Sequence, residues 1–115
     1  MLEEYELIDR SAAPKEADFC LIMDNELMAP LIKKGERIYV SRRQSPGDME
    51  LGIFAYKGQV YCRQFCMDYA GNLHLLCANP LHEKDNLCLT PKEQTGCHCL
   101  GKVLMKKKPP MPVYL

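Results

Sequence analysis

Short runs of β-branched, aromatic and aliphatic residues, separated by turn signals, make up most of this chain of 115 residues. No segment shows ten or more residues of helical periodicity, so β-strands are the element that such runs predict. The clearest signal is the Lys57-Gly58 pair, which predicts a two-residue hairpin turn between strands at 51–56 and 59–67. The pattern predicts a mostly β fold of many short strands, curled or barrel-like, with at most short helical turns.

The remaining runs predict the other strands and the domain boundaries. These strands are expected at residues 19–23, 37–41, 73–77, 87–89 and about 97–106. A turn or short helix is expected at 28–32. The length fits a single domain. Residues 1–16 are expected to be a linker or N-terminal extension, residues 17–106 the domain and residues 107–115 a C-terminal tail.

Charge and hydropathy exclude two classes of protein. Fifteen basic and fifteen acidic side chains cancel, whereas a DNA-binding module usually has a basic face and a high pI. No apolar run approaches the roughly 20 residues of a membrane span, and the acidic start lacks the features of a signal peptide. We therefore expect a cytoplasmic protein that neither binds DNA through this chain nor contacts a membrane.

One ordered set of residues lies between the first two main strands. The set comprises Asn25, Leu27, Met28, Pro30, Gly35 and the apolar strand at 38–40. It resembles the segment that carries the serine nucleophile in the LexA and phage-repressor family of Ser-Lys autoproteases, which reads roughly Gly-x-Ser-Met-x-Pro before a Gly-Asp-x-hydrophobic strand. Asn25 stands at the glycine and Leu27 at the serine. Asparagine adopts the left-handed conformation more readily than most residues, so the turn is expected to survive.

The second half of the dyad can be compared independently. The family has a strand that reads roughly Val-x-Val-Lys-Arg-Leu, whose lysine is the general base, and residues 60–65 place Arg63 at that lysine. A guanidinium, with a pKa above about 12, stays protonated and cannot take a proton from a serine. Leu27 has no atom that can attack a carbonyl. The resemblance therefore implies a degenerate peptidase that is not an enzyme, with Leu27 packed into the former cleft.

Downstream motifs extend the resemblance over most of the chain. A strand ending in Asn79-Pro80 and a closing strand at 101–105 match the family in order and spacing. The resemblance implies a compact, highly twisted, mostly antiparallel β structure of the LexA and signal-peptidase-like barrel type.

The same resemblance implies a function. In the family, an N-terminal helix-turn-helix reads DNA and this domain couples two copies, so we expect a non-catalytic regulatory and dimerisation domain of a phage- or prophage-type transcriptional repressor. The helix-turn-helix is not in this chain, and DNA would be bound only through it. A homodimer is expected, with an interface formed by Gly101, Val103, Met105, Val113 and Tyr114.

Two alternatives stay open. The former protease cleft could bind a peptide or another ligand as a sensor, with lining residues Asn25, Leu27, Met28, Pro30 and Arg63. A minor alternative is an active LexA-like peptidase that uses an unconventional dyad. Among the serines, however, Ser11, Ser41 and Ser45 lie in predicted loops or at a strand end, so no replacement nucleophile is visible.

Seven cysteines raise the question of disulfides and metals. The odd number and their position in apolar runs favour reduced thiols that act as small hydrophobes. Zinc sites commonly have two to four residues between cysteines, which Cys97-His98-Cys99 does not offer. Cys62 and Cys66 share a strand face, and His74 and His82 have no partner at ligand spacing. We expect no metal site and no cofactor.

Overall fold

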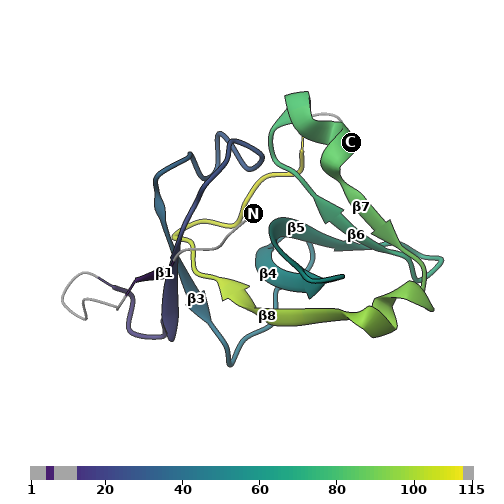
Figure 1. Cartoon of the computed structure of the whole chain (residues 1–115), viewed down its shortest axis with the longest axis horizontal. Coiled ribbons are helices and arrows are strands. Elements are labelled where there is room, and N and C mark those ends of the chain that lie inside the picture. Colours follow the sequence, from purple (N-terminus) through teal and green to yellow (C-terminus); the bar gives the residue numbers. More distant parts are fainter. Residues whose placement is uncertain (1–4, 7–12, 113–115) are drawn as a thin grey trace.

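Eight strands form one antiparallel sheet in the order β1-β2-β3-β8-β4-β5-β6-β7 (Figure 1). The computed structural model describes residues 5–6 and 13–112. The strands are β1 (Tyr5–Glu6), β2 (Phe19–Ile22), β3 (Arg37–Ser41), β4 (Leu51–Tyr56), β5 (Gln59–Met67), β6 (Leu73–Leu76), β7 (Leu87–Leu89) and β8 (Cys97–Val103). Two short 3-10 helices, η1 (Pro80–Asp85) and η2 (Glu93–Gly96), are the helices of the described part. The predicted mostly β, antiparallel fold is confirmed.

The hairpin between β4 and β5 has the predicted turn. Lys57 and Gly58 both have positive φ, of 48° and 76°, and Tyr56 pairs with Gln59 on either side of them. Positive φ at both central residues is the geometry that lets a two-residue turn match the twist of its strands.

Strand β8 connects the two halves of the sheet. Its end pairs with β3 (Val40↔Val103), while the rest of the strand pairs with β4. The pairing shifts register between Ile53 and Phe54, opposite Gly101, where φ is +156°. A Cβ on Gly101 would lie 2.5 Å from the carbonyl oxygen of Ser41, so glycine allows β8 to approach β3 closely.

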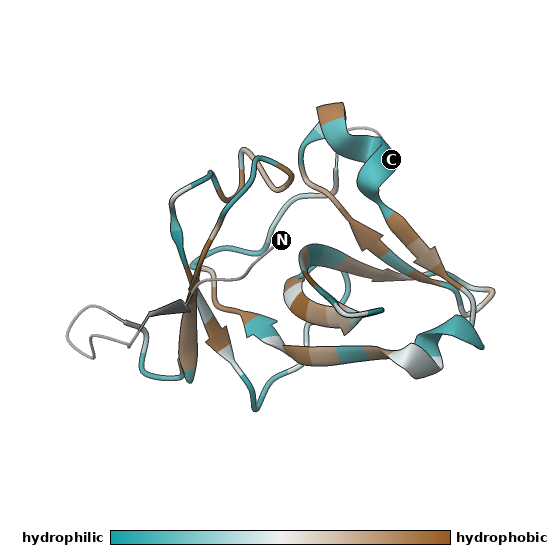
Figure 2. Cartoon of the chain, in the orientation of Figure 1, coloured by the Kyte–Doolittle hydropathy of each residue, from teal (hydrophilic) through white to brown (hydrophobic). Residues whose placement is uncertain are grey.

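Two hydrophobic clusters fill the molecule. The larger contains Leu21, Met23, Met28, Ile32, Ile38, Val40, Leu51, Ile53, Cys62 and Val103, and the smaller contains Phe54, Leu73, Leu75 and Leu89. Figure 2 shows hydrophobic residues concentrated on the strands, whereas the turn after β3 and the two 3-10 helices are largely hydrophilic. The first cluster lies where β2 and β3 meet β4, β5 and β8, and the second between β4, β6 and β7.

Several segments differ from the sequence prediction. Strands β2 and β6 each end one residue earlier than predicted, at Ile22 and Leu76. Strand β8 ends at Val103, short of the predicted 106, because the chain leaves the ladder after Leu104, whose N–H still donates to the Tyr39 carbonyl at 2.8 Å. Within the predicted linker or extension at 1–16, β1 pairs with β2, with Tyr5 opposite Leu21. No helix among the described residues is long and apolar enough to cross a membrane.

Candidate functional site

The turn that contains Leu27 connects β2 to β3. Backbone hydrogen bonds close its base, since Met23 N–H donates to the Glu36 carbonyl at 2.9 Å and Gly35 N–H donates to the Met23 carbonyl at 2.8 Å. Residue 27 is thereby presented at the tip of a fixed loop, and none of these bonds uses its side chain.

Asn25 supports the turn in a way that the sequence analysis did not predict. Its φ is not positive, so it does not use the left-handed conformation that asparagine allows. Instead, its Oδ1 accepts a hydrogen bond from Leu27 N–H at 3.0 Å, and its Nδ2 donates to Asp24 Oδ1 at 2.9 Å. A side-chain turn of this kind, common for asparagine, replaces the conformation that glycine would have supplied.

Asn79, which follows the end of β6, connects the Leu27 turn to the segment after β6 through hydrogen bonds. Its Nδ2 donates to the Glu26 carbonyl at 2.8 Å and its N–H to the Leu27 carbonyl at 3.0 Å. Its Oδ1 also accepts from Leu81 N–H at 3.0 Å and caps η1. An asparagine just before a proline is a recognisable N-cap. The long-range bonds to the turn carry no sequence signal, and the role of Asn79 was missed.

The other predicted cleft residues divide by burial. Met28 is fully buried in the larger hydrophobic cluster, whereas Pro30 is exposed. Leu27 itself is partly buried and belongs to neither cluster. Leu27, the residue predicted to stand at the nucleophile position, therefore lies at the edge of the core, while the buried Met28 after it anchors the turn.

Arg63 lies on β5 and is only 5% exposed. Its Nη1 donates to the Cys62 carbonyl at 2.9 Å, and its guanidinium carbon lies 5.1 Å from the centre of the Tyr61 ring. Its Nε is buried without a hydrogen-bond partner, and no ion pair joins it to a carboxylate within the described chain. Burying a cation without a counter-ion costs free energy, and Arg63 is the charged side chain that is buried in the described part of the chain.

The end of β6 connects the two predicted positions. The charge of Arg63 acts on the thiol of Cys77, whose pKa is raised by burial and lowered by the guanidinium. Two residues later, Asn79 holds the Leu27 turn. The structure thus places Leu27 and Arg63 on elements joined through residues 77–79, although no hydrogen bond links the two side chains in the described part of the chain.

The family model for Peptidase S24-like proteins matches residues 2–104, which is most of the chain. The chain belongs to the Peptidase S24-like family. This match confirms the resemblance to the LexA and phage-repressor family that the motifs indicated. A search of the curated proteins returned no significant match.

Leu27 and Arg63, the residues predicted to stand at the dyad positions, offer no nucleophilic atom and no neutral base. Two other side chains with a hydroxyl or a thiol lie in buried surroundings. Ser41 is buried on β3 beside Gly101, and Cys62 packs in the larger cluster, where burial raises the pKa of its thiol to about 12. A thiol with that pKa remains protonated and unreactive near neutral pH.

The tail of the S24-like domain docks on its own chain as far as Pro112. Gln64 is fully buried, and its Nε2 donates to the Met49 carbonyl at 2.8 Å and to the Pro110 carbonyl at 2.9 Å. Pro109 and Pro112 are buried as well. Gln64 therefore anchors an extended segment that contributes few backbone donors of its own.

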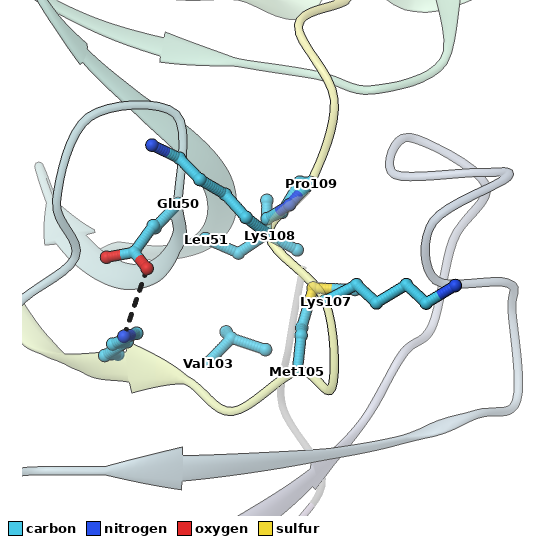
Figure 3. A pocket seen from close by; sticks show the side chains of 8 residues that line it. Glu50, Leu51, Val103, Met105, Lys107, Lys108 and Pro109 are labelled. Carbon is cyan, nitrogen blue, oxygen red and sulfur yellow. Dashed lines mark ion pairs between the residues drawn. The ribbon is translucent and has the colours of Figure 1, made fainter.

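Beside the tail lies a shallow pocket of about 70 Å³. Its lining includes Glu50, Lys102, Met105, Lys107 and Lys108, and Figure 3 shows the ion pair across it. Lys102 Nζ lies 3.1 Å from Glu50 Oε2. A hydrogen bond from Gly47 N–H and then this lysine hold the pKa of Glu50 below its usual value.

The predicted dimer-interface residues occupy different environments. Gly101 and Val103 are buried inside their own chain, so neither presents a side chain to a partner, whereas Met105 is 38% exposed. Val113 and Tyr114 lie outside the described residues.

No disulfide links the seven cysteines, all of which lie in the described part of the chain. Among the described residues, no three His, Cys, Asp or Glu side chains are grouped so that they could hold a metal ion. Cys97 and Cys99 lie close enough for their charges to interact, but burial is the larger effect and raises the pKa of each.

Proposed function

We propose that this S24-like domain is the non-catalytic regulatory and dimerisation domain of a phage- or prophage-type helix-turn-helix repressor. The observation that carries the proposal is the pairing of a preserved scaffold with replaced chemistry. The turn at Leu27 is held at its base and by Asn79, and Arg63 lies on the hairpin strand that corresponds to the base position.

Two chemical requirements of Ser-Lys catalysis support the absence of activity. The nucleophile must offer a hydroxyl, and the base must lose a proton when it is desolvated. Leu27 offers only aliphatic carbon, and the Arg63 guanidinium keeps its proton even when buried. With both steps removed, the role left to the domain is to bind, to couple or to signal.

Coupling two copies is the role that fits a repressor best. Linking two DNA-binding modules raises their combined affinity through effective concentration, and the two-fold symmetry of a dimer matches palindromic operators. The net charge of zero supports a division of labour in which the helix-turn-helix contacts DNA and this domain contacts its copy.

We place the dimer interface on the closing segment 101–105 together with the tail. Since Gly101 and Val103 face their own core, Met105 is the outward residue of this segment. Leu100 of β8, 39% exposed, is a further exposed apolar side chain. Val113 and Tyr114 stay predicted members of the interface.

Sedimentation equilibrium at several concentrations tests the dimer. Met105→Glu puts a charge on the proposed interface and should raise the dimer dissociation constant about tenfold or more, since burying an unpaired charge costs over 1.4 kcal/mol. Met67→Glu is the matched control, because Met67 is similarly exposed, at 43%, at the far end of β5. A wild-type chain that stays monomeric at high concentration, or equal effects of the two variants, would contradict the proposed interface.

Incubation at alkaline pH followed by mass spectrometry tests the absence of catalysis. High pH favours proton loss from a base, so it is the condition under which a hidden dyad would act. We expect the intact mass alone. Specific fragments that appear in the wild-type chain and disappear in Arg63→Met would overturn the proposal.

A second candidate function, a ligand sensor, rests on Arg63 alone. A cation that is 5% exposed, with an unpartnered Nε and no ion pair to a carboxylate among the described residues, is the kind of group that a carboxylate or another anion would neutralise. Calorimetric titration with short peptides that end in a free carboxylate tests it. Binding that is lost in Arg63→Met but kept in Arg43→Met, which removes an exposed cation, would favour the sensor.

A further inference from the structure

The pocket beside the tail is formed by three segments that are far apart in the sequence. Glu50 lies just before β4, Lys102 lies near the end of β8, and Lys107 and Lys108 belong to the tail (Figure 3). The lining therefore carries three lysines and one carboxylate. The pocket includes neither Leu27 nor Arg63, so its properties do not depend on the proposed loss of catalysis.

The tail segment that lines the pocket is held at both of its ends. Leu104 N–H donates to the Tyr39 carbonyl at 2.8 Å, and Gln64 Nε2 donates to the Pro110 carbonyl at 2.9 Å. Pro109 between them is buried. The backbone of residues 105–109 is therefore fixed on the domain, so the pocket is already formed before any ligand binds, which lowers the ordering cost of binding.

The charges in the pocket are not balanced. Glu50 is fully engaged, because its Oε1 accepts from Gly47 N–H at 2.7 Å and its Oε2 lies 3.1 Å from Lys102 Nζ. Lys107 and Lys108 form no ion pair within the described part of the chain. Gly47 N–H and Lys102 lower the pKa of Glu50 most, and the charge of Lys108 adds to their effect. Two positive charges thus remain without a counter-ion beside the pocket.

Free backbone donors accompany these charges. The chain bends at Lys106 and Lys107, and the N–H groups of residues 105–108 donate to no acceptor in the part of the chain that the structure describes. Successive unpaired N–H groups in a turn are a common component of anion-binding sites. The tail therefore offers an anion both ammonium groups and main-chain donors.

The size and the charge of the pocket select the class of anion. A site for a single water needs roughly 10–15 Å³. A volume of about 70 Å³ therefore has room for one phosphate group in place of several waters. A phosphate monoester carries a charge of about −1.5 to −2 at pH 7 and three strong acceptor oxygens, which matches two unbalanced lysines. Lysine binds phosphate as a point charge.

We propose that this pocket binds a phosphate dianion, either inorganic phosphate or the phosphate group of a monoester. Figure 3 shows Lys108 extending on the side of Glu50 and Lys107 extending in the opposite direction. Lys108 contacts the bound phosphate directly, and Lys107 turns toward it on its flexible stem. The Lys102–Glu50 ion pair forms the opposite wall and limits how many positive charges the ligand can use.

Amide NMR titration of the full chain with methyl phosphate tests this assignment, because it detects weak binding and locates it. Met105 lines the pocket and is also placed at the proposed dimer interface, so the association state is first measured by sedimentation at the same concentration. We expect saturable shifts of the amide signals of residues 102–108. Dimethyl phosphate is the control ligand, since it has the same tetrahedral group with a single charge, and it should bind about fivefold or more weakly.

Two results of this titration would overturn the proposal. One is the absence of saturable shifts at residues 102–108, and the other is equal binding of methyl phosphate and dimethyl phosphate. Titration with inorganic phosphate then identifies the source. Tighter binding of methyl phosphate assigns the site to monoesters, and tighter binding of inorganic phosphate assigns it to the free ion.

Paired variants separate a pocket from general attraction to lysines. Lys107→Gln with Lys108→Gln should raise the dissociation constant for methyl phosphate about tenfold. Lys33→Gln with Lys34→Gln is the matched control, because it removes two exposed lysines from the turn between β2 and β3 and changes the net charge equally. Equal weakening by the two double variants would overturn the proposal.

Glu50→Gln gives an effect of the opposite sign. Its amide oxygen can still accept from Gly47 N–H, but the neutral side chain releases the charge of Lys102. Methyl phosphate should then bind about threefold more tightly. Weaker binding in Glu50→Gln, with the amide spectrum otherwise unchanged, would contradict the assignment.

Discussion

Replacing Gln64 by glutamate tests how the tail is held on the domain. The wild-type side chain is fully buried and its Nε2 donates to two carbonyl oxygens, those of Met49 and Pro110. Glutamate has nearly the same volume, so it removes no packing. It replaces a group with two hydrogens by one that carries at most a single hydrogen, and none when ionised.

The free-energy cost of Gln64→Glu follows from its protonation state. When protonated, the side chain loses one of two hydrogen bonds, about 1 kcal/mol. When ionised, it is desolvated and faces two carbonyl oxygens, so its pKa in the folded state rises above the unfolded value of about 4.3. A raised carboxyl pKa leaves stability unaffected below about pH 4.3 and lowers it by about 1.4 kcal/mol per pH unit until the folded pKa is passed. At pH 7 the added loss reaches up to about 4 kcal/mol, a large share of an ordinary 5–15 kcal/mol.

Urea unfolding at pH 5, 6, 7 and 8 measures this directly. Gln64→Leu is the control, because it loses both hydrogen bonds but cannot titrate, so its deficit should not change with pH. Trypsin cleavage after Lys106 and Lys107 adds a local readout, since a released tail is cut faster than a docked one. A loss of free energy of unfolding in Gln64→Glu that does not grow with pH would refute the role of Gln64 in holding the tail. An unchanged rate of tail cleavage in this variant would refute it as well.

Three further outcomes are expected. Asn79→Ala removes the side-chain hydrogen bonds to the Glu26 carbonyl and from Leu81 N–H, and it should lower the free energy of unfolding by about 1–2 kcal/mol, measured in urea. An unchanged free energy of unfolding would show that Asn79 does not stabilise the Leu27 turn. Metal analysis under reducing conditions should find less than one tightly bound zinc per chain, and stoichiometric zinc with melting on chelation would contradict this. The pKa of Asp68 is lowered from 3.8 to about 2, so its carboxylate contributes to the free energy of unfolding above pH 3.8, and this contribution is lost as the pH falls through 2. An acid unfolding curve that is the same in Asp68→Asn as in the wild-type chain would contradict this expectation.

Local turn chemistry explains why much of the fold could be predicted. The Lys57-Gly58 turn fixed both strand ends of its hairpin, and β3 and β7 have the predicted bounds. The placement of β8 between β3 and β4 could not be predicted from local signals. It depends on a close approach at Gly101 to a carbonyl 60 residues earlier in the chain, and a lone glycine in a strand does not specify its neighbour.

In the candidate site, too, local features could be predicted from the sequence and long-range contacts could not. The identities of Leu27 and Arg63 could be read directly from the sequence, because each stands inside a short ordered motif. The contacts that hold them in place could not, since Asn79 bonds to a carbonyl 53 residues away and Arg63 is buried on β5, a strand that pairs with both β4 and β6. Asparagine can support a turn either through a left-handed backbone or through a side-chain hydrogen bond. The sequence does not say which, and Asn25 uses its side chain.

Leu27 and Arg63, which are predicted to stand at the dyad positions, share one structural property, which is that the scaffold does not need a serine or a lysine there. The Leu27 turn is held by main-chain groups and by Asn25 and Asn79, so any side chain that tolerates partial burial can stand at position 27. At position 63, the guanidinium bonds to the Cys62 carbonyl and stacks on Tyr61, so the strand keeps its place without a neutral amine. Catalytic chemistry can therefore be lost at both positions while the β architecture is retained. Because that architecture also carries the closing strand and the anchored tail, the dimer surface proposed above does not depend on the side chains at positions 27 and 63.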